Sequence, residues 1–337
     1  MTTATIAPQG TDSMTALVHD RYGAFDQLRV QQIAKPVPGP KEVRVQVHAA
    51  ALHAGDCMCV KGSPRIVRVA TGLFGPKNSV PGFDVAGVVE AVGADVKDFR
   101  EGDEVFGACM GACATYACVS EDHLAHKPTN LTLKEAAAVS TSGLAALHAL
   151  RDAADLQSGQ RILINGAAGG VGHFAVQIAK AFGAHVTGVC SGQSAEMVRA
   201  LGADEVLDYT KQDFAAGGPR FDVIFDNVEN RSLSDCRAAL KPNGTLIANS
   251  GTGATGLRFM TRLFKPLLLS PFVGQKLKRF VSTPNRKDLL ALKELIEAGK
   301  LRPVIDRTYS LAQVPAALTL IEAGHTHGKV LIELEVA

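Results

Sequence analysis

Hydrophobic and polar positions alternate differently in two parts of the chain, and this difference predicts an α/β fold with two domains. From Met14 to about Lys127, short β-type runs such as 43–48 and 85–92 are separated by Pro and Gly. Strands with so many turns are typical of an antiparallel, barrel-like domain. From about Leu133 to Phe280, strand-like and helix-like patterns alternate, which predicts a parallel sheet covered by helices on both faces. Its predicted strands are 162–164, 186–189, 206–208, 223–226 and 246–248.

The two ends of the chain have their own patterns. Beyond Pro284 the sequence predicts a helix over 286–298, an extended piece over 301–305, a helix over 311–322 and a last strand over 329–333. Residues 1–13 have neither the basic start nor the apolar stretch of a signal peptide. We interpret them as a flexible tail, with the fold beginning near Met14.

The most informative motif is a glycine-rich turn between an apolar run and an amphipathic helical pattern. The run 162–164 meets the turn 166–172, and the helical pattern begins directly after it. Backbone N–H groups and the positive end of a helix can hold a pyrophosphate at such a turn. The strand–turn–helix order therefore favours a dinucleotide site over an ordinary turn between a strand and a helix.

The end of the second strand indicates which dinucleotide would bind. An NAD-binding unit usually carries an acidic residue there, which accepts hydrogen bonds from the ribose and repels a 2′-phosphate. Here residues 190–194 read Cys-Ser-Gly-Gln-Ser, and the first carboxylate is Glu196. This predicts NADPH rather than NADH, although no Arg or Lys stands at the strand end. Ser191 and Ser194 also suit the N-cap of the next helix.

Composition adds limits on compartment and partners. The chain has 337 residues and a net charge of +2, so nothing in it points to nucleic acid. No apolar run reaches the ~18–20 residues that span a bilayer. Seven scattered cysteines are typical of free thiols in a reducing compartment, which predicts a cytoplasmic enzyme.

Four motifs, at 82–93, 102–107, 166–172 and 328–332, occur in the order typical of the medium-chain dehydrogenase/reductase superfamily. Within it the chain most resembles the zinc-free quinone oxidoreductases, including the reticulon-interacting mitochondrial reductases and the chloroplast-envelope homologues. The resemblance covers almost everything from Met14 onward. It implies a GroES-like substrate domain (14–135 and 283–337) interrupted by a Rossmann domain (136–282), so that the last ~50 residues return to the first domain.

The positions at which zinc-dependent members of the superfamily bind their metal are poor in ligands here. The family's Gly-His-Glu corresponds to Gly82-Phe83-Asp84, and phenylalanine cannot bind a metal. Serine and threonine fill 140–142, where a cysteine is expected, and the cysteines at 109, 113 and 118 lack the spacing of a structural zinc site. His53 alone could ligate zinc. We therefore predict an enzyme without a metal.

Without a metal, the chemistry most compatible with this resemblance is hydride transfer from NADPH to a small hydrophobic quinone or α,β-unsaturated carbonyl. The resemblance places His53 beside the nicotinamide, where relatives usually have Asn. His53 either donates a proton or only hydrogen-bonds the cofactor. Two other functions stay open: an alcohol dehydrogenase or carbonyl reductase of the same superfamily, and a non-catalytic NADPH-binding protein. Glu229, which stands where relatives usually have Gly, keeps the last one open.

The resemblance also implies a set of cofactor-binding residues spread along the chain. They cover the phosphate turn, the adenosine 2′-phosphate, a strand end, the nicotinamide loop and a C-terminal loop that folds back onto the cofactor. In that order they are Ala168, Gly169, Gly170 and Val171; Ser191 and Tyr209; Asn227; Ser250 and Gly251; His325 and His327. The two histidines also suit a solvated turn.

The segment 257–280 alternates apolar and basic residues at roughly helical spacing, and Pro266 and Pro271 break it into short pieces. Such a segment suits a lid over a hydrophobic acceptor, a subunit contact, a peripheral contact with anionic lipid, or a core-packing insertion. We favour the lid, because it follows the predicted nicotinamide loop. A monomer or a homodimer is expected.

Overall fold

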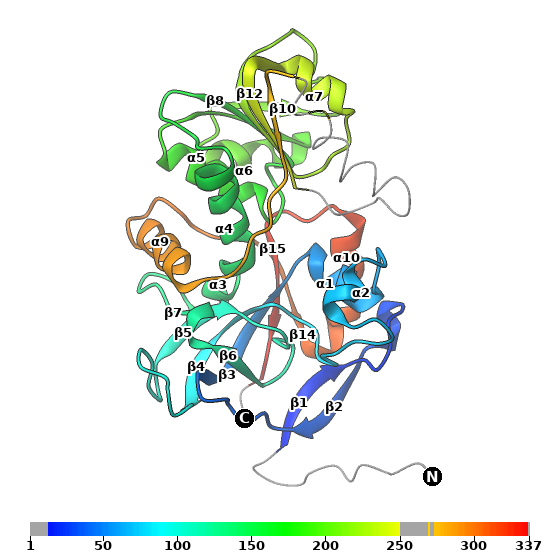
Figure 1. The fold of residues 1–337 in the computed structure, drawn as a ribbon, viewed down its shortest axis with the longest axis vertical. Helices are drawn as coiled ribbons and strands as arrows, with labels where there is room; N and C mark the ends of the chain where they lie inside the picture. The colour runs from blue at the N-terminus through cyan, green and yellow to red at the C-terminus, as the bar shows by residue number, and fades with distance from the viewer. Residues whose placement is uncertain (1–12, 250–268, 270–272, 336–337) are drawn as a thin grey trace.

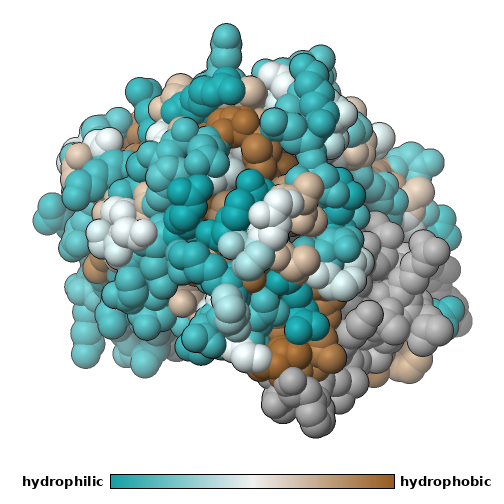
Figure 2. Space-filling model, turned by 90° about the horizontal axis from the view of Figure 1, so that it is seen from above, coloured by the Kyte–Doolittle hydropathy of each residue, from teal (hydrophilic) through white to brown (hydrophobic). Residues whose placement is uncertain are grey.

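The structure is a computed structural model, and it describes residues 13–249, 269 and 273–335. A parallel sheet occupies the upper half of Figure 1, and a mainly antiparallel sheet occupies the lower half. No helix in these ranges is both long enough and apolar enough to cross a membrane. The face shown in Figure 2 is mostly hydrophilic, with hydrophobic residues in small patches.

The parallel sheet has six strands in the order β10-β9-β8-β11-β12-β13. Numbered along the chain, this is the order 3-2-1-4-5-6 of a doubly wound nucleotide-binding fold, so the predicted fold class is confirmed. The strands are β8 (Arg161–Asn165), β9 (His185–Cys190), β10 (Glu205–Asp208), β11 (Phe221–Asp226), β12 (Leu240–Ala248) and β13 (Lys276–Lys278).

β13 corrects part of the interpretation of 257–280 as an amphipathic lid. It pairs with β12 at the edge of the sheet, and Leu277 is buried in the core. Residues 276–278 are therefore part of the sheet. Most of the preceding stretch, including Phe259 and Leu263, lies outside the described residues.

Helices cover both faces of this sheet, because the strands place too many apolar side chains on those faces to remain in water. The helical elements are α4 (Ser140–Leu147), η3 (His148–Ala153), α5 (Gly172–Ala181), η4 (Gly192–Ser194), α6 (Ala195–Ala200) and α7 (Leu233–Ala239). α5 is buried over its first eight residues and begins directly at the glycine-rich turn. The turn is thus fixed between a central strand and a buried helix.

The lower sheet is mainly antiparallel, as predicted, and the last strand of the chain completes it. Its order is β14-β15-β3-β4-β5-β7, with β6 paired to β3, and β1 and β2 form a separate hairpin. β15 lies antiparallel to β3, so the chain returns to the first domain as the resemblance implied. The strands are β1 (Ser13–Val18), β2 (Arg29–Ala34), β3 (Glu42–Leu52), β4 (Asp84–Val92), β5 (Glu104–Ala108), β6 (Tyr116–Ser120), β7 (Leu124–His126), β14 (Ile305–Ser310) and β15 (Lys329–Glu333).

Some predicted bounds shift in the structure. β1 begins at Ser13, inside the predicted tail. The extended piece 301–305 is not a strand, because β14 pairs with β15 only from Ile305 onward. The helix predicted over 311–322 is two elements, since Pro315 stands at the start of the second. Outside the parallel-sheet half, the described helices are η1 (Phe25–Gln27), α1 (Ala54–Lys61), α2 (Val67–Thr71), η2 (Glu121–His123), α3 (Leu133–Ala137), α9 (Arg286–Glu297), η6 (Leu311–Gln313) and α10 (Val314–Ala323).

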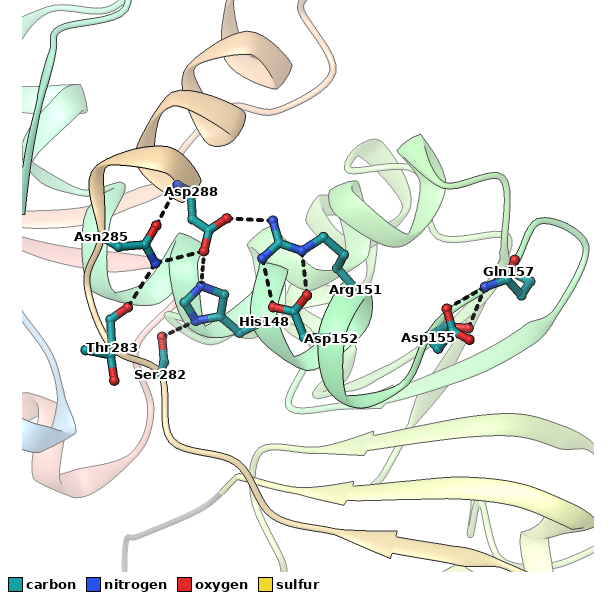
Figure 3. A network of polar contacts seen from close by, with 9 residues as sticks. All are labelled: His148, Arg151, Asp152, Asp155, Gln157, Ser282, Thr283, Asn285 and Asp288. Carbon is teal, nitrogen blue, oxygen red and sulfur yellow. Dashed lines mark hydrogen bonds and ion pairs between the residues drawn. The ribbon is translucent and has the colours of Figure 1, made fainter.

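A polar network fixes the segment through which the chain returns from the upper to the lower half. Figure 3 shows the Asp288 carboxylate between His148, Arg151 and Asn285. His148 Nε2 lies 2.9 Å and Arg151 Nη1 lies 2.7 Å from the Asp288 oxygens. The Arg151 guanidinium holds the pKa of Asp288 well below its usual value. The start of α9 is therefore tied to η3.

Candidate functional site

The glycine-rich turn is shaped by two glycines and left open by two others. A Cβ at Gly172 would lie 2.0 Å from the Gly166 carbonyl oxygen, and Gly166 itself has φ +78°, so the fold itself requires glycine at both positions. At Gly169 and Gly170 an added Cβ would meet nothing closer than 3.4 Å and 3.5 Å. Their openness leaves room for a ligand to approach the backbone closely.

The turn forms the wall of a cavity of about 490 Å³. This volume is in the range of small-molecule sites, and the cavity lies at the carboxyl ends of β8 and β11, where the strand order reverses. Every predicted site residue within the described ranges lines it: His53, Ala168, Gly169, Gly170, Val171, Ser191, Tyr209, Asn227, His325 and His327. Ser250 and Gly251 lie outside the described residues.

Two serine hydroxyls are available at the end of the cavity where the sequence predicts the adenosine of the cofactor. The Ser191 and Ser194 side chains do not cap the helices that follow them, and their oxygens lie 3.3 Å apart. Both serines do stand at N-cap positions, of η4 and α6, as the alternative held, but neither side chain makes a capping hydrogen bond. The Tyr209 side chain, about half exposed, lines the same end of the cavity.

The sequence analysis missed one carboxylate near this end. Asp208 pairs with Cys190 across β10 and β9, so an acid does stand beside the end of the second strand. Its carboxylate accepts hydrogen bonds from the Thr210 N–H and hydroxyl, and these bonds lower its pKa. Asp208 is not among the residues that line the cavity. Inspecting the neighbouring strand end as well would have revealed it.

His53 presents one ring nitrogen without a partner. Its Nδ1 accepts the Gly55 N–H at 2.9 Å at the start of α1, so in the neutral ring the proton is on Nε2. Nε2 is buried and has no hydrogen-bond partner within the described ranges. The Asp56 carboxylate accepts the His53 backbone N–H at 2.8 Å, and burial raises its pKa. His53 can therefore donate a hydrogen bond to a bound molecule, while Asp56 holds the backbone.

A buried ion pair lies below the glycine-rich turn. Lys329 Nζ lies 2.9 Å from Asp84 Oδ2 and 3.1 Å from Ser142 Oγ, and both charged side chains are fully buried. The Thr141 N–H donates to the other Asp84 oxygen at 2.8 Å. The adjoining Gly328 N–H donates to the Ala168 carbonyl of the turn at 2.8 Å. The first residues of β15 thus support the turn from below.

Asp84 and Ser142 stand at positions where the family resemblance implied zinc ligands in metal-dependent members. Asp84 and Ser142 are committed to Lys329, and Phe83 packs its ring 5.2 Å from that of His53. Across the described part of the chain, no cluster of three His, Cys, Asp or Glu residues could hold a metal ion. Burial raises the pKa of the Cys57, Cys59 and Cys109 thiols to about 12, and a protonated thiol is a poor metal ligand.

Glu229 is accommodated by a salt bridge beside the cavity. Its φ is +53°, a left-handed conformation that glycine adopts more readily. The Glu229 N–H donates to Asp226 at 2.8 Å, and its carboxylate lies 2.6 Å from Arg279. Because Glu229 does not line the cavity, this departure from the family pattern leaves the crevice open.

A second cavity has a volume of about 270 Å³, and Phe83, whose ring packs against His53, forms part of its lining. Its lining includes Cys59, Val80, Pro81 and Met110 and is mainly apolar. One aromatic ring therefore contacts both the histidine of the first cavity and the interior of the second.

Replacing Gly169 by Ala is expected to weaken NADPH binding about tenfold, or ~1.4 kcal/mol. The added methyl group fits the fold but occupies the space through which a pyrophosphate would approach the backbone. Calorimetric titration gives the affinity, and thermal denaturation should show an unchanged midpoint. Gly75→Ala, whose Cβ would lie an ordinary 3.7 Å from Asp20 O, is the matched control. Equal NADPH affinity in wild type and Gly169→Ala would contradict the assignment.

Comparisons with known proteins agree with this architecture. Residues 39–131 match the family model for the alcohol dehydrogenase GroES-like domain, and 201–332 match that for zinc-binding dehydrogenases. The chain is 34% identical to bovine "NAD(P)H oxidoreductase RTN4IP1, mitochondrial", covering 98% of this chain and 91% of the relative. It is 34% identical to an Arabidopsis thaliana "NADPH-dependent alkenal/one oxidoreductase, chloroplastic", covering 95% and 79%. The structure of a quinone oxidoreductase from Coxiella burnetii superposes with a TM-score of 0.84 at 28% identity, over 96% of this chain and all of the other.

These names contradict the predicted cytoplasmic location, because the relatives are named mitochondrial or chloroplastic. The prediction failed because unpaired cysteines indicate a reducing environment and do not identify the compartment. The four motifs, the strand order and the identities over almost the whole chain agree with one another. The chain belongs to the quinone oxidoreductase-like family of the medium-chain dehydrogenase/reductase superfamily.

Proposed function

We propose that the protein transfers hydride from NADPH to a quinone or an α,β-unsaturated carbonyl compound, and that it does so without a metal. The observation that carries this proposal is the convergence of ten predicted residues, distant in sequence, on one cavity where the strand order reverses. The names of the relatives include both NAD(P)H and alkenal/one oxidoreductases, which supports a nicotinamide cofactor and a conjugated acceptor.

The residues of the cavity suit the parts of such a cofactor. The Gly170 backbone N–H would hold the pyrophosphate over the open space at Gly169, whose own N–H already donates to the Gly166 carbonyl. Ser191 and Tyr209 would contact the adenosine 2′-phosphate. Bound NADPH supplies the hydride. His53 Nε2 would then donate a hydrogen bond to the acceptor oxygen, whose charge increases as hydride arrives at carbon, and water would supply the proton.

The second cavity suits the acceptor. It is mainly apolar and slightly smaller than usual ligand pockets, which favours small hydrophobic compounds. Phe83 borders it and contacts His53, so an acceptor there would lie near the proposed donor. The buried Lys329–Asp84 pair carries no net charge and both side chains are fully buried, so Lys329 would not contact an acceptor.

The test follows NADPH absorbance with a panel of quinones, enones, aldehydes and, in reverse, alcohols. We expect turnover with quinones or enones, tighter binding of NADPH than of NADH, and full activity after exhaustive chelation. His53→Phe should lower kcat about a hundredfold, while His53→Asn, which keeps a donor, should stay near wild type. Turnover of aldehydes and alcohols alone would favour the dehydrogenase alternative. NADPH binding without turnover would favour the non-catalytic one, and activity lost on chelation would contradict metal independence.

A further inference from the structure

Four large apolar side chains are exposed to solvent within the nine residues 66–74, which begin one residue before α2 and end three residues after it. Ile66 is 55% exposed, Val69 67%, Leu73 62% and Phe74 102%. We name these four residues the α2 surface. Exposed apolar residues are ordinary when they are isolated, whereas a continuous group marks an interaction site. α2 lies at the periphery of the lower half of the molecule in Figure 1.

The charge around the α2 surface has a single sign. Residues 57–83 contain Lys61, Arg65, Arg68 and Lys77 and no Asp or Glu, in a chain whose total net charge is only +2. Lys61 pairs with Glu322, and Arg68 lies over the Tyr22 ring. Arg65 and Lys77 are exposed, and their side chains have no acidic partner within the described residues. The α2 surface is therefore flanked by unneutralised positive charge.

The apolar side chains are held outward by a closed turn. The Tyr22 hydroxyl donates to the Gly72 carbonyl at 2.7 Å, and the Lys77 N–H donates to the Thr71 carbonyl at 2.7 Å. A Cβ at Gly72 would lie 2.0 Å from the Gly75 carbonyl oxygen, so the chain closes tightly here. Leu73 and Phe74 lie at the tip of this turn. Their exposure follows from its geometry.

The same segment forms one wall of the second cavity. Ala70, Thr71, Pro76 and Lys77 line it together with Phe83. Ala70 and Lys77 are exposed, so the cavity reaches the surface beside the α2 surface.

We propose that the α2 surface docks on a lipid bilayer that contains anionic lipids. Aromatic and branched apolar side chains enter the boundary between headgroups and acyl chains, and flanking Arg and Lys residues are attracted to anionic headgroups. The positive charge of 57–83 complements anionic headgroups. Leu73 and Phe74 project from a narrow turn, and this shape favours a bilayer over an acidic protein or a second copy of the chain. The proposal does not depend on the proposed enzymatic function.

The test is co-sedimentation of the full chain, without cofactor or acceptor, with vesicles of phosphatidylcholine alone or with about one-third phosphatidylglycerol. We expect wild type to bind the anionic vesicles, and to be released by high salt. Leu73→Ser/Phe74→Ser should reduce binding at least tenfold, and Arg65→Gln/Lys77→Gln should reduce binding to anionic vesicles only. Val37→Ser, at a separate residue that is 83% exposed, is the matched control and should bind like wild type.

Three results would overturn the proposal. One is equal vesicle binding by wild type and Leu73→Ser/Phe74→Ser, with both proteins folded by thermal denaturation. The second is an equal loss in Val37→Ser, which would make the effect unspecific. The third is a wild-type dimer that Leu73→Ser/Phe74→Ser converts to a monomer in sedimentation without any vesicle binding by wild type, because the α2 surface would then be a subunit contact.

Discussion

Lys329→Met is expected to lower the free energy of unfolding by about 3–5 kcal/mol, because it leaves the Asp84 carboxylate buried without its cation. Both side chains are fully buried, and Asp84 would keep only the Thr141 N–H as a partner. The loss would reach the glycine-rich turn as well, since Gly328 donates to the Ala168 carbonyl. NADPH affinity should therefore fall together with stability.

Chemical denaturation of the variant gives the free energy directly. The double variant Lys329→Met/Asp84→Leu should recover much of the loss, because a buried apolar pair carries no unpaired charge. Lys211→Met, at a side chain that is 78% exposed, is the control and should change stability by less than about 0.5 kcal/mol. Equal stability of Lys329→Met and Lys211→Met would contradict a stabilising role of the buried Lys329–Asp84 pair.

Mild acid is expected to destabilise the protein through His173. Burial is the main cause that lowers the pKa of this histidine from 6.5 to about 4. The hydrogen bond to the Gly169 carbonyl opposes this shift, and the cation of Lys329 adds to it. Between these two values the unfolded chain binds a proton that the folded chain does not. Stability from His173 is therefore fully present above pH 6.5 and falls as the pH decreases towards 4, by roughly 3 kcal/mol in all.

The measurement is the free energy of unfolding at neutral pH and at about pH 5, where the contribution of His173 should have fallen by about 2 kcal/mol. His173→Asn keeps a donor for the Gly169 carbonyl and cannot take up the proton, so its stability should fall less than that of wild type over this interval. His325→Asn replaces an exposed histidine and should follow wild type. Parallel pH profiles for wild type and His173→Asn would contradict the role of His173.

The core of the upper sheet was predictable because each of its buried strands is a short apolar run between turn residues. β13 was missed because a single buried residue, Leu277, between two lysines gives almost no pattern at an edge strand. The helix predicted over 311–322 is confirmed as α10, but the α-helix begins only beside Pro315, since proline begins helices more easily than it continues them. The return of β15 to β3 came only from the family resemblance, because periodicity does not specify pairing partners.

The features of the site also differ in how far they could be predicted from the sequence. The glycine-rich turn is local, so its strand–turn–helix context could be recognised from adjacent residues. The Lys329–Asp84 pair joins residues 245 positions apart, and Asp208 lies beside Cys190 only through strand register. The ion pair leaves no signal in a single sequence, whereas Asp208 ends the predicted strand 206–208 and could have been recognised there. The availability of His53 Nε2 depends on the tautomer that Gly55 imposes, which is likewise a property of the folded chain.

The late arrival of β15 has a consequence for synthesis on the ribosome. Until residues 329–333 leave the exit tunnel, residues 49–52 of β3 have an unpaired backbone edge where β15 will pair. An exposed edge of this kind invites pairing with other chains, so the nascent protein is vulnerable to aggregation until β15 has emerged and paired. The glycine-rich turn also lacks its bond from Gly328 until then. A cofactor bound at this turn therefore stabilises the chain most fully once β15 has joined the lower sheet.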